Sequence, residues 1–133
     1  MLDIDHFKRV NDAYGHEAGD VVLKGLSGLL VQQVRAVDRV CRYGGEEFTV
    51  ILPETDAAMA MQIAERMRAE VERQPFDIGD GKTVGITVSI GVATYPQHVD
   101  SPEEVVNAAD IALYAAKLAG RNRVSRYETE MSA

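Results

Sequence analysis

The order of apolar and polar residues along this chain predicts a mixed fold of strands and helices. Alternation predicts strands at 1–5, 38–43, 47–52 and 84–92, and a short strand near Val124. Apolar residues at helical spacing predict helices from about 19 to 34 and from 56 to 73. The last helix should begin at the capping box Ser101-Pro102-Glu103-Glu104 and end at Gly120. Residues 77–82 are polar and contain glycine, which indicates a connection.

The predicted element order, β-α-β-β-α-β, is that of the ferredoxin-like fold, extended by a final helix and strand. The expected class is α+β, with an antiparallel-containing sheet and helices packed on one face. In this topology the first strand lies beside the central hairpin. Asp3 should therefore approach Glu46 and Glu47, which lie more than forty positions away.

Composition narrows the classes of function. A chain of 133 residues forms one domain, and its formal charge of −7 argues against general nucleic-acid binding. The single Cys41 excludes an internal disulfide and fits a reducing compartment, so we expect a cytoplasmic location. Cys41 lies on a strand pattern, which favours a buried small hydrophobe. There is no apolar run of membrane-spanning length and no leader pattern, so we expect no membrane contact by this chain.

The central hairpin carries the most informative residues, Arg42-Tyr43-Gly44-Gly45-Glu46-Glu47-Phe48. A glycine pair between two apolar runs predicts a tight turn. Glycine leaves space for a phosphate to approach the main chain, and two carboxylates beside it could hold the accompanying metal ion. An ordinary turn followed by solvated acids explains this motif, taken alone, equally well.

A second acidic strand favours the metal interpretation. In Leu2-Asp3-Ile4-Asp5 the two aspartates project from one face and the apolar residues from the other. The alternative is a charged strand edge that discourages aggregation. A polar loop and a helix start follow, at His6 to Asp12 and Gly15 to Asp20. Together these features suit a site for magnesium and a nucleotide.

At this point the sequence resembles the GGDEF-domain diguanylate cyclases, in the GGEEF variant. The resemblance rests on blocks in the expected order over about residues 1–124: Leu2 to Lys8, Asn11-Asp12, Gly15-His16, Gly19-Asp20, Arg42 to Phe48, Thr87 to Ala93, and Ala109 to Asn122. It implies a nucleotidyl-cyclase palm-type fold, a GGDEF domain over residues 1–127 and a tail over 128–133.

The resemblance also implies a reaction, in which two GTP molecules condense to cyclic di-GMP and two pyrophosphates. Mg²⁺, or alternatively Mn²⁺, would be bound by Asp3, the Ile4 carbonyl, Glu46 and Glu47. Glu46 and Glu47 would be the catalytic pair; Glu46 is the candidate base, and a bound water is the alternative. One domain would hold one GTP, so catalysis implies a homodimer.

The remaining substrate residues follow from the same motifs. Phe7 and Lys8, with Gly44 of the turn, would bind phosphates, helped by Lys117 and Arg121. The i,i+4 spacing of this last pair would place both cations on one side of a helix end, where dipole capping is the alternative role. Guanine would be read by Asn11 and Asp20, and His16 also matches the family pattern.

An Arg-x-x-Asp motif, Arg35 to Asp38, matches the inhibitory site that binds the product cyclic di-GMP in this family, and Arg66 would complete it. The alternative is an exposed ion pair worth about 0–1 kcal/mol. Family domains also carry a helix and an Asp-x-Leu-Thr-Gly-Leu-like segment before the first strand, which this sequence does not contain. We therefore expect an N-terminally truncated domain that is linked in the full-length protein to an upstream sensory domain, through which the protein could be attached to a membrane.

Two other hypotheses stay open. The chain could be a non-catalytic module that binds GTP or cyclic di-GMP, although such a receptor has no need for Glu46 and Glu47. It could also be a nucleotidyl cyclase with another product, against which Asn11 and Asp20 argue.

Overall fold

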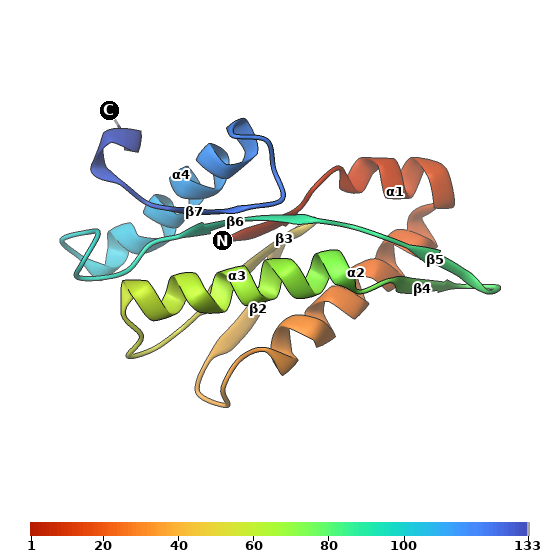
Figure 1. Cartoon of the computed structure of the whole chain (residues 1–133), viewed down its shortest axis with the longest axis horizontal. Helices are drawn as coiled ribbons and strands as arrows, with labels where there is room; N and C mark the ends of the chain where they lie inside the picture. The colour runs from red at the N-terminus through yellow and green to blue at the C-terminus, as the bar shows by residue number, and fades with distance from the viewer. Residues whose placement is uncertain (133) are drawn as a thin grey trace.

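The computed structural model describes residues 1–132 and confirms the α+β class (Figure 1). The α-helices are α1 (Phe7–Tyr14), α2 (His16–Gln32), α3 (Ala57–Arg73) and α4 (Val105–Leu118), and the short 3-10 helix η1 (Pro102–Glu104) precedes α4. The strands are β1 (Leu2–Ile4), β2 (Arg39–Gly44), β3 (Glu47–Ile51), β4 (Phe76–Gly79), β5 (Lys82–Val84), β6 (Val88–Val92) and β7 (Val124–Arg126). A 3-10 turn, η2 (Thr129–Ser132), lies within the predicted tail, whose last residue is outside the described range.

The main sheet has the order β2-β3-β1-β6-β7, with β1 at its centre. β1 is antiparallel to β3 and to β6, whereas β6 and β7 are parallel. The register places Asp3 opposite Glu47 of β3 and opposite Ser89 of β6. The predicted approach of the first strand to the central hairpin is thus confirmed.

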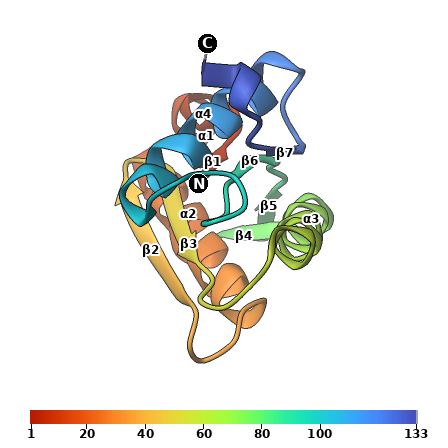
Figure 2. The same cartoon turned by 90° about the vertical axis from the view of Figure 1, so that its left-hand side faces the viewer.

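Helices cover both faces of this sheet, so the expectation of helices on one face was wrong. Leu2 and Ile4 point into the core formed with α2 and α3, whereas Met1 packs against Ala109 and Leu113 of α4. Figure 2 shows α4 on one side of the sheet and α3 on the other. The close packing of α4 on the sheet depends on Gly91 of β6. A Cβ at Gly91 would lie 2.1 Å from main-chain atoms of α4, so a side chain there would push the helix off the sheet.

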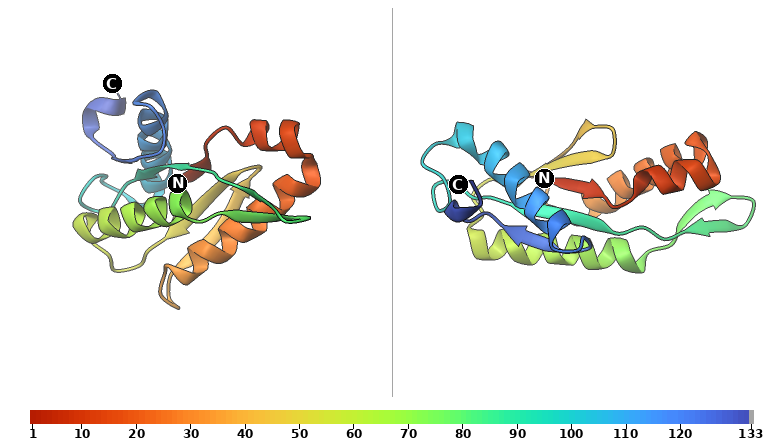
Figure 3. Two further views of the ribbon diagram at one scale, coloured as in Figure 1. Left: turned by 45° about the vertical axis from the view of Figure 1, so that its right-hand side comes forward. Right: turned by 90° about the horizontal axis from the view of Figure 1, so that it is seen from above.

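Two elements were not expected from the sequence. Helix α1 replaces a predicted polar loop. Its apolar residues Phe7, Val10 and Tyr14 recur at helical spacing, but the helix has only eight residues and buries only Val10 fully, so the pattern was short and was overlooked. The polar connection at 77–82 is the tip of a β4–β5 hairpin that extends from one end of the molecule (Figure 3). The predicted strand at 84–92 is divided, because Val84 pairs within this hairpin and β6 begins only at Val88. The alternating apolar residues reflect burial of one face of the chain, which continues through Ile86. They do not show where strand pairing begins and ends.

The expectation that Cys41 is buried was wrong. Cys41 is exposed because β2 is an edge strand whose residues are mostly open to solvent.

Among the described residues, no helix combines the length and the apolar character that a bilayer crossing needs.

Candidate functional site

The site begins with a buried carboxylate in the central strand. Asp3 is 6% exposed and faces α4, from which Lys117 forms an ion pair with its Oδ2 atom. The other carboxylate oxygen, Oδ1, is buried and has no hydrogen-bond partner. An unpaired buried carboxylate oxygen is costly, and a cation beside it would remove that cost.

Burial and neighbouring charges shift the pKa values of two acids at this site. Burial raises the pKa of Asp3, Lys117 opposes this rise, and the charge of Glu46 adds to it. Burial also raises the pKa of Glu47, with further increases from Asp3 and Asp110. Asp110 lies on α4, seven positions before Lys117, and therefore on the same helix face. Sequence reasoning did not assign it a role, although this two-turn spacing was visible.

Asp5, the second acid of β1, has a different role from Asp3. Its carboxylate accepts hydrogen bonds from Thr87 and Ser89, each at 2.7 Å, and from the main-chain amide of Asn122 at 2.9 Å. These bonds use both of its oxygens. Asp5 therefore fixes the end of β1 to the turn that follows α4, and its two oxygens, unlike Oδ1 of Asp3, both have hydrogen-bond partners.

The N-terminus of α1 lies directly after the acidic strand. His6 adopts a left-handed conformation, with φ 55°, and the helix begins at Phe7. The amide of Arg9 already donates to the His6 carbonyl at 2.9 Å, whereas no side chain caps this helix. The main-chain amides of Phe7 and Lys8 are the donors that this helix start offers to an anion.

Asn11 lies against the first turns of α2, beside the residue that precedes Asp20 in sequence. A Cβ placed on Gly19 would lie 2.1 Å from Oδ1 of Asn11, so the amide rests directly against the glycine that precedes Asp20. Asn11 is half-buried, whereas Asp20 is exposed and free to accept from a ligand. His16, the first residue of α2, is also exposed.

Arg121 lies in the turn that follows α4 and not on the helix itself. The helix ends at Leu118, and Gly120, Arg121 and Asn122 all have positive φ angles, of 126°, 64° and 46°. The predicted i,i+4 helical relationship of Lys117 and Arg121 was therefore wrong.

This turn is held from two sides. Asn122 donates its main-chain amide to Asp5, as described above, and its side chain bonds Arg68 and Glu72 of α3 at 2.8 and 2.6 Å. Two successive left-handed residues other than glycine persist only where their surroundings fix them, and such strain gathers at functional sites.

The Arg-x-x-Asp motif forms a compact pair away from the acidic cluster. Asp38 is buried. The guanidinium of Arg35 donates to its carboxylate from Nη2 at 2.9 Å and from Nε at 3.2 Å. These bonds keep the pKa of the Asp38 carboxyl below its usual range. Arg35 also donates to Thr55 and to the Pro53 carbonyl, each at 2.9 Å, yet its side chain stays half exposed.

Arg66 projects from α3 toward the same loop. It donates to the side-chain oxygen of Gln33 at 2.8 Å and to the main-chain oxygen of the same residue. Gln33 lies two positions before Arg35, so the three predicted residues of the product site share one region of the surface.

Gly44 and the two glutamates lie at the tip of the central hairpin. The turn residues are Gly45 and Glu46, and Gly45 has a positive φ of 47°. Open space surrounds the Cα of Gly44, where a Cβ would meet nothing within 4 Å. The amide of Ile4 approaches the Glu46 carbonyl at 3.4 Å, so the hairpin tip adjoins β1 beside Asp3.

The donor set suits a divalent cation completed by a ligand. Within residues 1–132, no three His, Cys, Asp or Glu side chains lie close enough to share an ion among themselves. Mg²⁺ is commonly held by one or two carboxylates together with substrate phosphates. The unpaired oxygen of Asp3, beside Glu46 and Glu47 and near the α1 amides, fits that pattern.

A palm-type sheet with paired acids on the central strand and hairpin defines the class of nucleotide cyclase domains. The chain belongs to the diguanylate cyclase GGDEF domain family, whose model matches residues 1–123. It is 47% identical over 125 residues to Diguanylate cyclase A of Treponema denticola, a match that covers 94% of this chain and 33% of that protein.

Solved structures show the same relationship. A GGDEF-only variant of TpbB (YfiN) from Pseudomonas aeruginosa superimposes with a TM-score of 0.93 and 39% identity, over 98% of this chain and 76% of that one. The GGDEF domain of DgcB from Caulobacter crescentus, in complex with c-di-GMP, has a TM-score of 0.86 and 39% identity, over 96% of this chain and 73% of that one. The chain spans about a third of the length of this relative from Treponema denticola.

Proposed function

We propose that this domain condenses two GTP molecules into cyclic di-GMP and two pyrophosphates in a reaction that depends on Mg²⁺ or Mn²⁺. The observation that carries the proposal is the buried, unpaired Oδ1 of Asp3, which lies opposite Glu47 at the tip of the glycine hairpin. A binding module that did not handle a metal would gain nothing from a carboxylate group kept in this costly state.

Asp3, the main-chain carbonyl of Ile4, Glu46 and Glu47 would hold the ion. When bound, it stabilises charge on the attacking oxygen and on the leaving pyrophosphate. The chemistry forms a bond between a ribose 3′-oxygen and an α-phosphate and breaks the bond from that phosphate to pyrophosphate. Glu46 is the candidate acceptor of the 3′-hydroxyl proton, directly or through a water molecule.

The rest of the site positions the nucleotide. The amides of Phe7 and Lys8 take the terminal phosphates at the helix start. The open space at Gly44 would let a phosphate approach the main chain of the hairpin. Lys117 and Arg121 add positive charge. Asn11 and Asp20 bind the guanine edge, with Asp20 accepting from its N–H groups.

The assignment of guanine has a physical basis. A site that hydrogen-bonds one base leaves its polar groups unpaired with another base, which is a strong basis for rejection. His16 lies one helical turn before Asp20, so both project from the same face of α2.

Because one domain holds one GTP, product formation requires two domains that face each other. Product bound at Arg35, Asp38 and Arg66 would restrain the pair in another arrangement. In a longer protein, an upstream sensory domain would control this pairing, and the GGDEF domain itself would act in the cytoplasm.

The test is incubation of the chain with GTP and Mg²⁺, followed by chromatographic separation of the nucleotides. The proposal expects cyclic di-GMP and pyrophosphate, and no product when EDTA is present. GTP binding should be measured by calorimetry in parallel, because it distinguishes an enzyme from a sensor. If the chain binds GTP but forms no product, even at protein concentrations that allow two domains to pair, a non-catalytic GTP or cyclic di-GMP sensor would be favoured.

A further inference from the structure

The turn after α4 holds Arg121 in a conformation that its own backbone disfavours. The amide of Arg121 donates to the Ala116 carbonyl at 3.0 Å. The amide of Gly120 donates to the Lys117 carbonyl at 3.3 Å, which completes a Schellman ending of the helix. Glycine adopts the positive φ of this ending readily, but Arg121 and Asn122 continue it with φ of 64° and 46°. Residues with a side chain keep such a conformation only where neighbouring groups fix it.

Two side chains of α3 fix the second of these left-handed residues. The side-chain oxygen of Asn122 accepts from Nη1 of Arg68 at 2.8 Å, and its side-chain nitrogen donates to Glu72 at 2.6 Å. An arginine can only donate and a carboxylate can only accept, so these two partners determine which way the amide points. Arg68 is only 16% exposed, and Glu65 accepts from its Nε at 3.0 Å. The partners of Asn122 are therefore themselves held in place.

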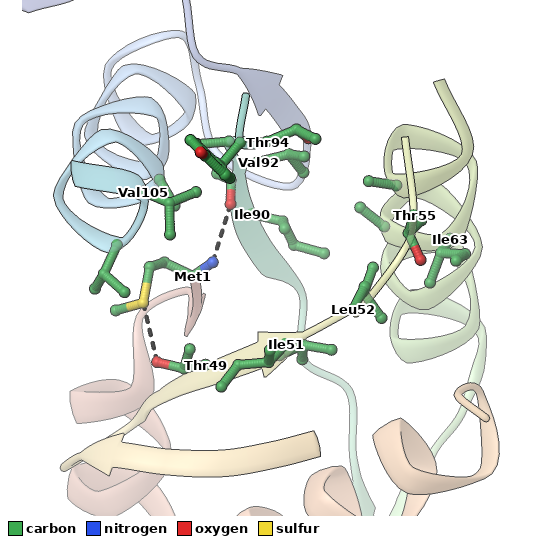
Figure 4. Close-up of a pocket in the computed structure, with 18 of the residues that line it drawn as sticks. Met1, Thr49, Ile51, Leu52, Thr55, Ile63, Ile90, Val92, Thr94 and Val105 are labelled. Atoms are coloured by element: carbon green, nitrogen blue, oxygen red, sulfur yellow. Dashed lines mark hydrogen bonds between the residues drawn. The ribbon is translucent and has the colours of Figure 1, made fainter. Parts of the chain in front are cut away.

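These bonds join elements that lie on opposite faces of the sheet. α3 covers one face and α4 the other (Figure 2). Between the first halves of the two helices lies a cavity of about 850 Å³, with Ile63 of α3 on one side and Val105 of α4 on the other (Figure 4). At the other end of α4, the side chain of Asn122 reaches α3 directly. Arg68 and Glu72 therefore connect α3 to the end of α4 through polar contacts.

The side chain of Arg121 differs from the main chain that carries it. Arg121 is half-buried, and within residues 1–132 its guanidinium has no hydrogen-bond or ion-pair partner. Lys117, one helical turn earlier, is by contrast paired with Asp3. The main chain at Arg121 is thus fixed on both sides while its charged group remains available to a ligand.

We propose that Arg68 and Glu72 are positioning residues for the nucleotide: through the side chain of Asn122 they fix the turn that directs Arg121 to the phosphates. This inference rests on the proposed function, in which Arg121 binds phosphate. A guanidinium on a fixed main chain loses less freedom when the ligand binds than one on a mobile turn, so it contributes more to affinity. The effect should concern the phosphates and not the guanine, because the base is assigned to residues of α1 and α2.

The experiment compares Arg68→Lys and Asn122→Gly with the parent chain. Lysine keeps the charge at position 68 but lacks the planar fork that bonds Asn122 and the glutamates together. Glycine at position 122 keeps the left-handed conformation accessible and leaves the ion pairs within α3 intact, but it has no side chain to hold. Arg73→Lys is the matched control, because Arg73 also forms an ion pair with a glutamate three positions earlier on α3, Glu70.

The first measurement needs no nucleotide. Hydrogen exchange of the Asn122 amide, which donates to Asp5 at 2.9 Å, is followed by NMR. Arg68→Lys and Asn122→Gly should each speed this exchange by at least about tenfold, and Arg73→Lys should not.

The second measurement is calorimetry with two ligands in the presence of Mg²⁺. One is GMP, and the other is a GTP analogue with a methylene group between its α and β phosphates, from which no pyrophosphate can leave. Arg68→Lys and Asn122→Gly should each weaken binding of the analogue by at least about fivefold, while the affinity for GMP stays within about twofold. A general loss of structure would weaken both ligands alike, so this difference is specific to a positioning role.

Arg121→Ala distinguishes failure of this inference from failure of the proposed function. It should weaken binding of the analogue by about tenfold, and adding Arg68→Lys should then cause no further loss. If Arg121→Ala weakens the analogue but Arg68→Lys and Asn122→Gly do not, the positioning role is wrong and the phosphate assignment stands. Full affinity in Arg121→Ala would overturn the phosphate assignment and this inference with it. Unchanged exchange of the Asn122 amide in both α3-contact variants would overturn the inference alone, because the turn would then hold without α3.

Discussion

Lys117 is the counterion of Asp3, across 114 positions of sequence. The lysine is 27% exposed and the aspartate side chain 8%, so the pair spans the boundary between solvent and the α4 side of the sheet. In the absence of an ion, this contact offsets part of the repulsion among the acids around Asp3. Lys117 therefore has a structural role in addition to the proposed contact with phosphate.

Replacement of this lysine should affect the metal-free domain most. We expect Lys117→Met to lower the free energy of unfolding by about 2 kcal/mol in EDTA. This loss lies between those typical of breaking an exposed ion pair and a buried ion pair. Millimolar Mn²⁺ should recover much of the loss, because a bound cation can replace the lysine beside Asp3. Urea unfolding with and without Mn²⁺ measures both effects. Lys82→Met, at an exposed position of β5, is the control, and an equal loss under both conditions would contradict the prediction.

The two hairpin glutamates should be needed for turnover but not for folding. We expect Glu46→Gln and Glu47→Gln to lower GTP turnover by about 10²–10⁴-fold. Glu47→Gln should also unfold no earlier than the parent chain, because burial and nearby acids raise the pKa of Glu47 and its charge is unfavourable. The measurements are cyclic di-GMP formation at saturating Mg²⁺ and thermal unfolding. Exposed Glu103→Gln should change neither, and near-normal turnover in a hairpin variant would refute the catalytic assignment.

Two glycines of α2 offer a matched test of the guanine pocket. A Cβ at Gly19 collides with Asn11, whereas a Cβ at Gly28 meets nothing within 4 Å. We expect Gly19→Ala to weaken GTP binding at least about tenfold by displacing the Asn11 amide. Gly28→Ala should leave binding unchanged and stabilise the helix by about 0.5–1 kcal/mol.

Calorimetry with GTP and ATP on these variants and on Asp20→Ala tests the base selectivity. The parent chain should prefer GTP, and Asp20→Ala should lose most of that preference. Equal affinities of the parent chain for the two nucleotides would remove the assignment of Asn11 and Asp20.

Sequence patterns were most informative where burial is regular. The alternation in Leu2-Asp3-Ile4-Asp5 correctly placed both aspartates on one face, but it could not distinguish them. The two aspartates differ because Thr87, Ser89 and Asn122 donate hydrogen bonds to Asp5. No such donor reaches Oδ1 of Asp3, which stays unpaired. Such bonds depend on tertiary pairing of segments more than eighty positions apart, and local spacing does not reveal them.

Other differences have similar physical causes. The apolar stripe of helix α1 has only three residues, Phe7, Val10 and Tyr14, among polar ones, which is too short to stand out from a loop. Cys41 is exposed because β2 forms an edge of the sheet, which the sequence pattern alone does not identify. The turn at 120–122 depends on contacts with α3, so the helical spacing of Lys117 and Arg121 did not predict its left-handed residues.

The Arg35 region should bind cyclic di-GMP independently of the acidic cluster. We expect binding to survive Glu46→Gln and to weaken at least about tenfold in Arg35→Lys, which keeps the charge but loses the planar fork that can grip a phosphate or guanine. Arg66→Ala should weaken binding as well. Exposed Arg73→Ala is the control, and calorimetry with cyclic di-GMP is the measurement. Full affinity in Arg35→Lys and Arg66→Ala would leave Arg35 and Asp38 as only an ion pair.

The buried amine of Met1 should make the stability of this chain depend on pH. Its pKa falls from 8.0 to about 6 on folding, so between these values the unfolded chain binds more protons than the folded chain. Stability should therefore rise from pH 6 to pH 8 and then level off, by at most about 2–3 kcal/mol. Urea unfolding at several pH values measures this rise.

Nα-acetylation isolates the contribution of Met1 to that rise. Burial also lowers the pKa of His98, which adds a rise in stability with pH in an overlapping range. The acetylated chain keeps His98 but has no titrating amine, so it should show a smaller rise, and the difference between the two chains belongs to Met1. His98→Gln should reduce the rise in both chains by the same amount. Equal pH dependence of the free and acetylated chains would mean that the amine is solvated, and that burial of its charge costs this fold nothing.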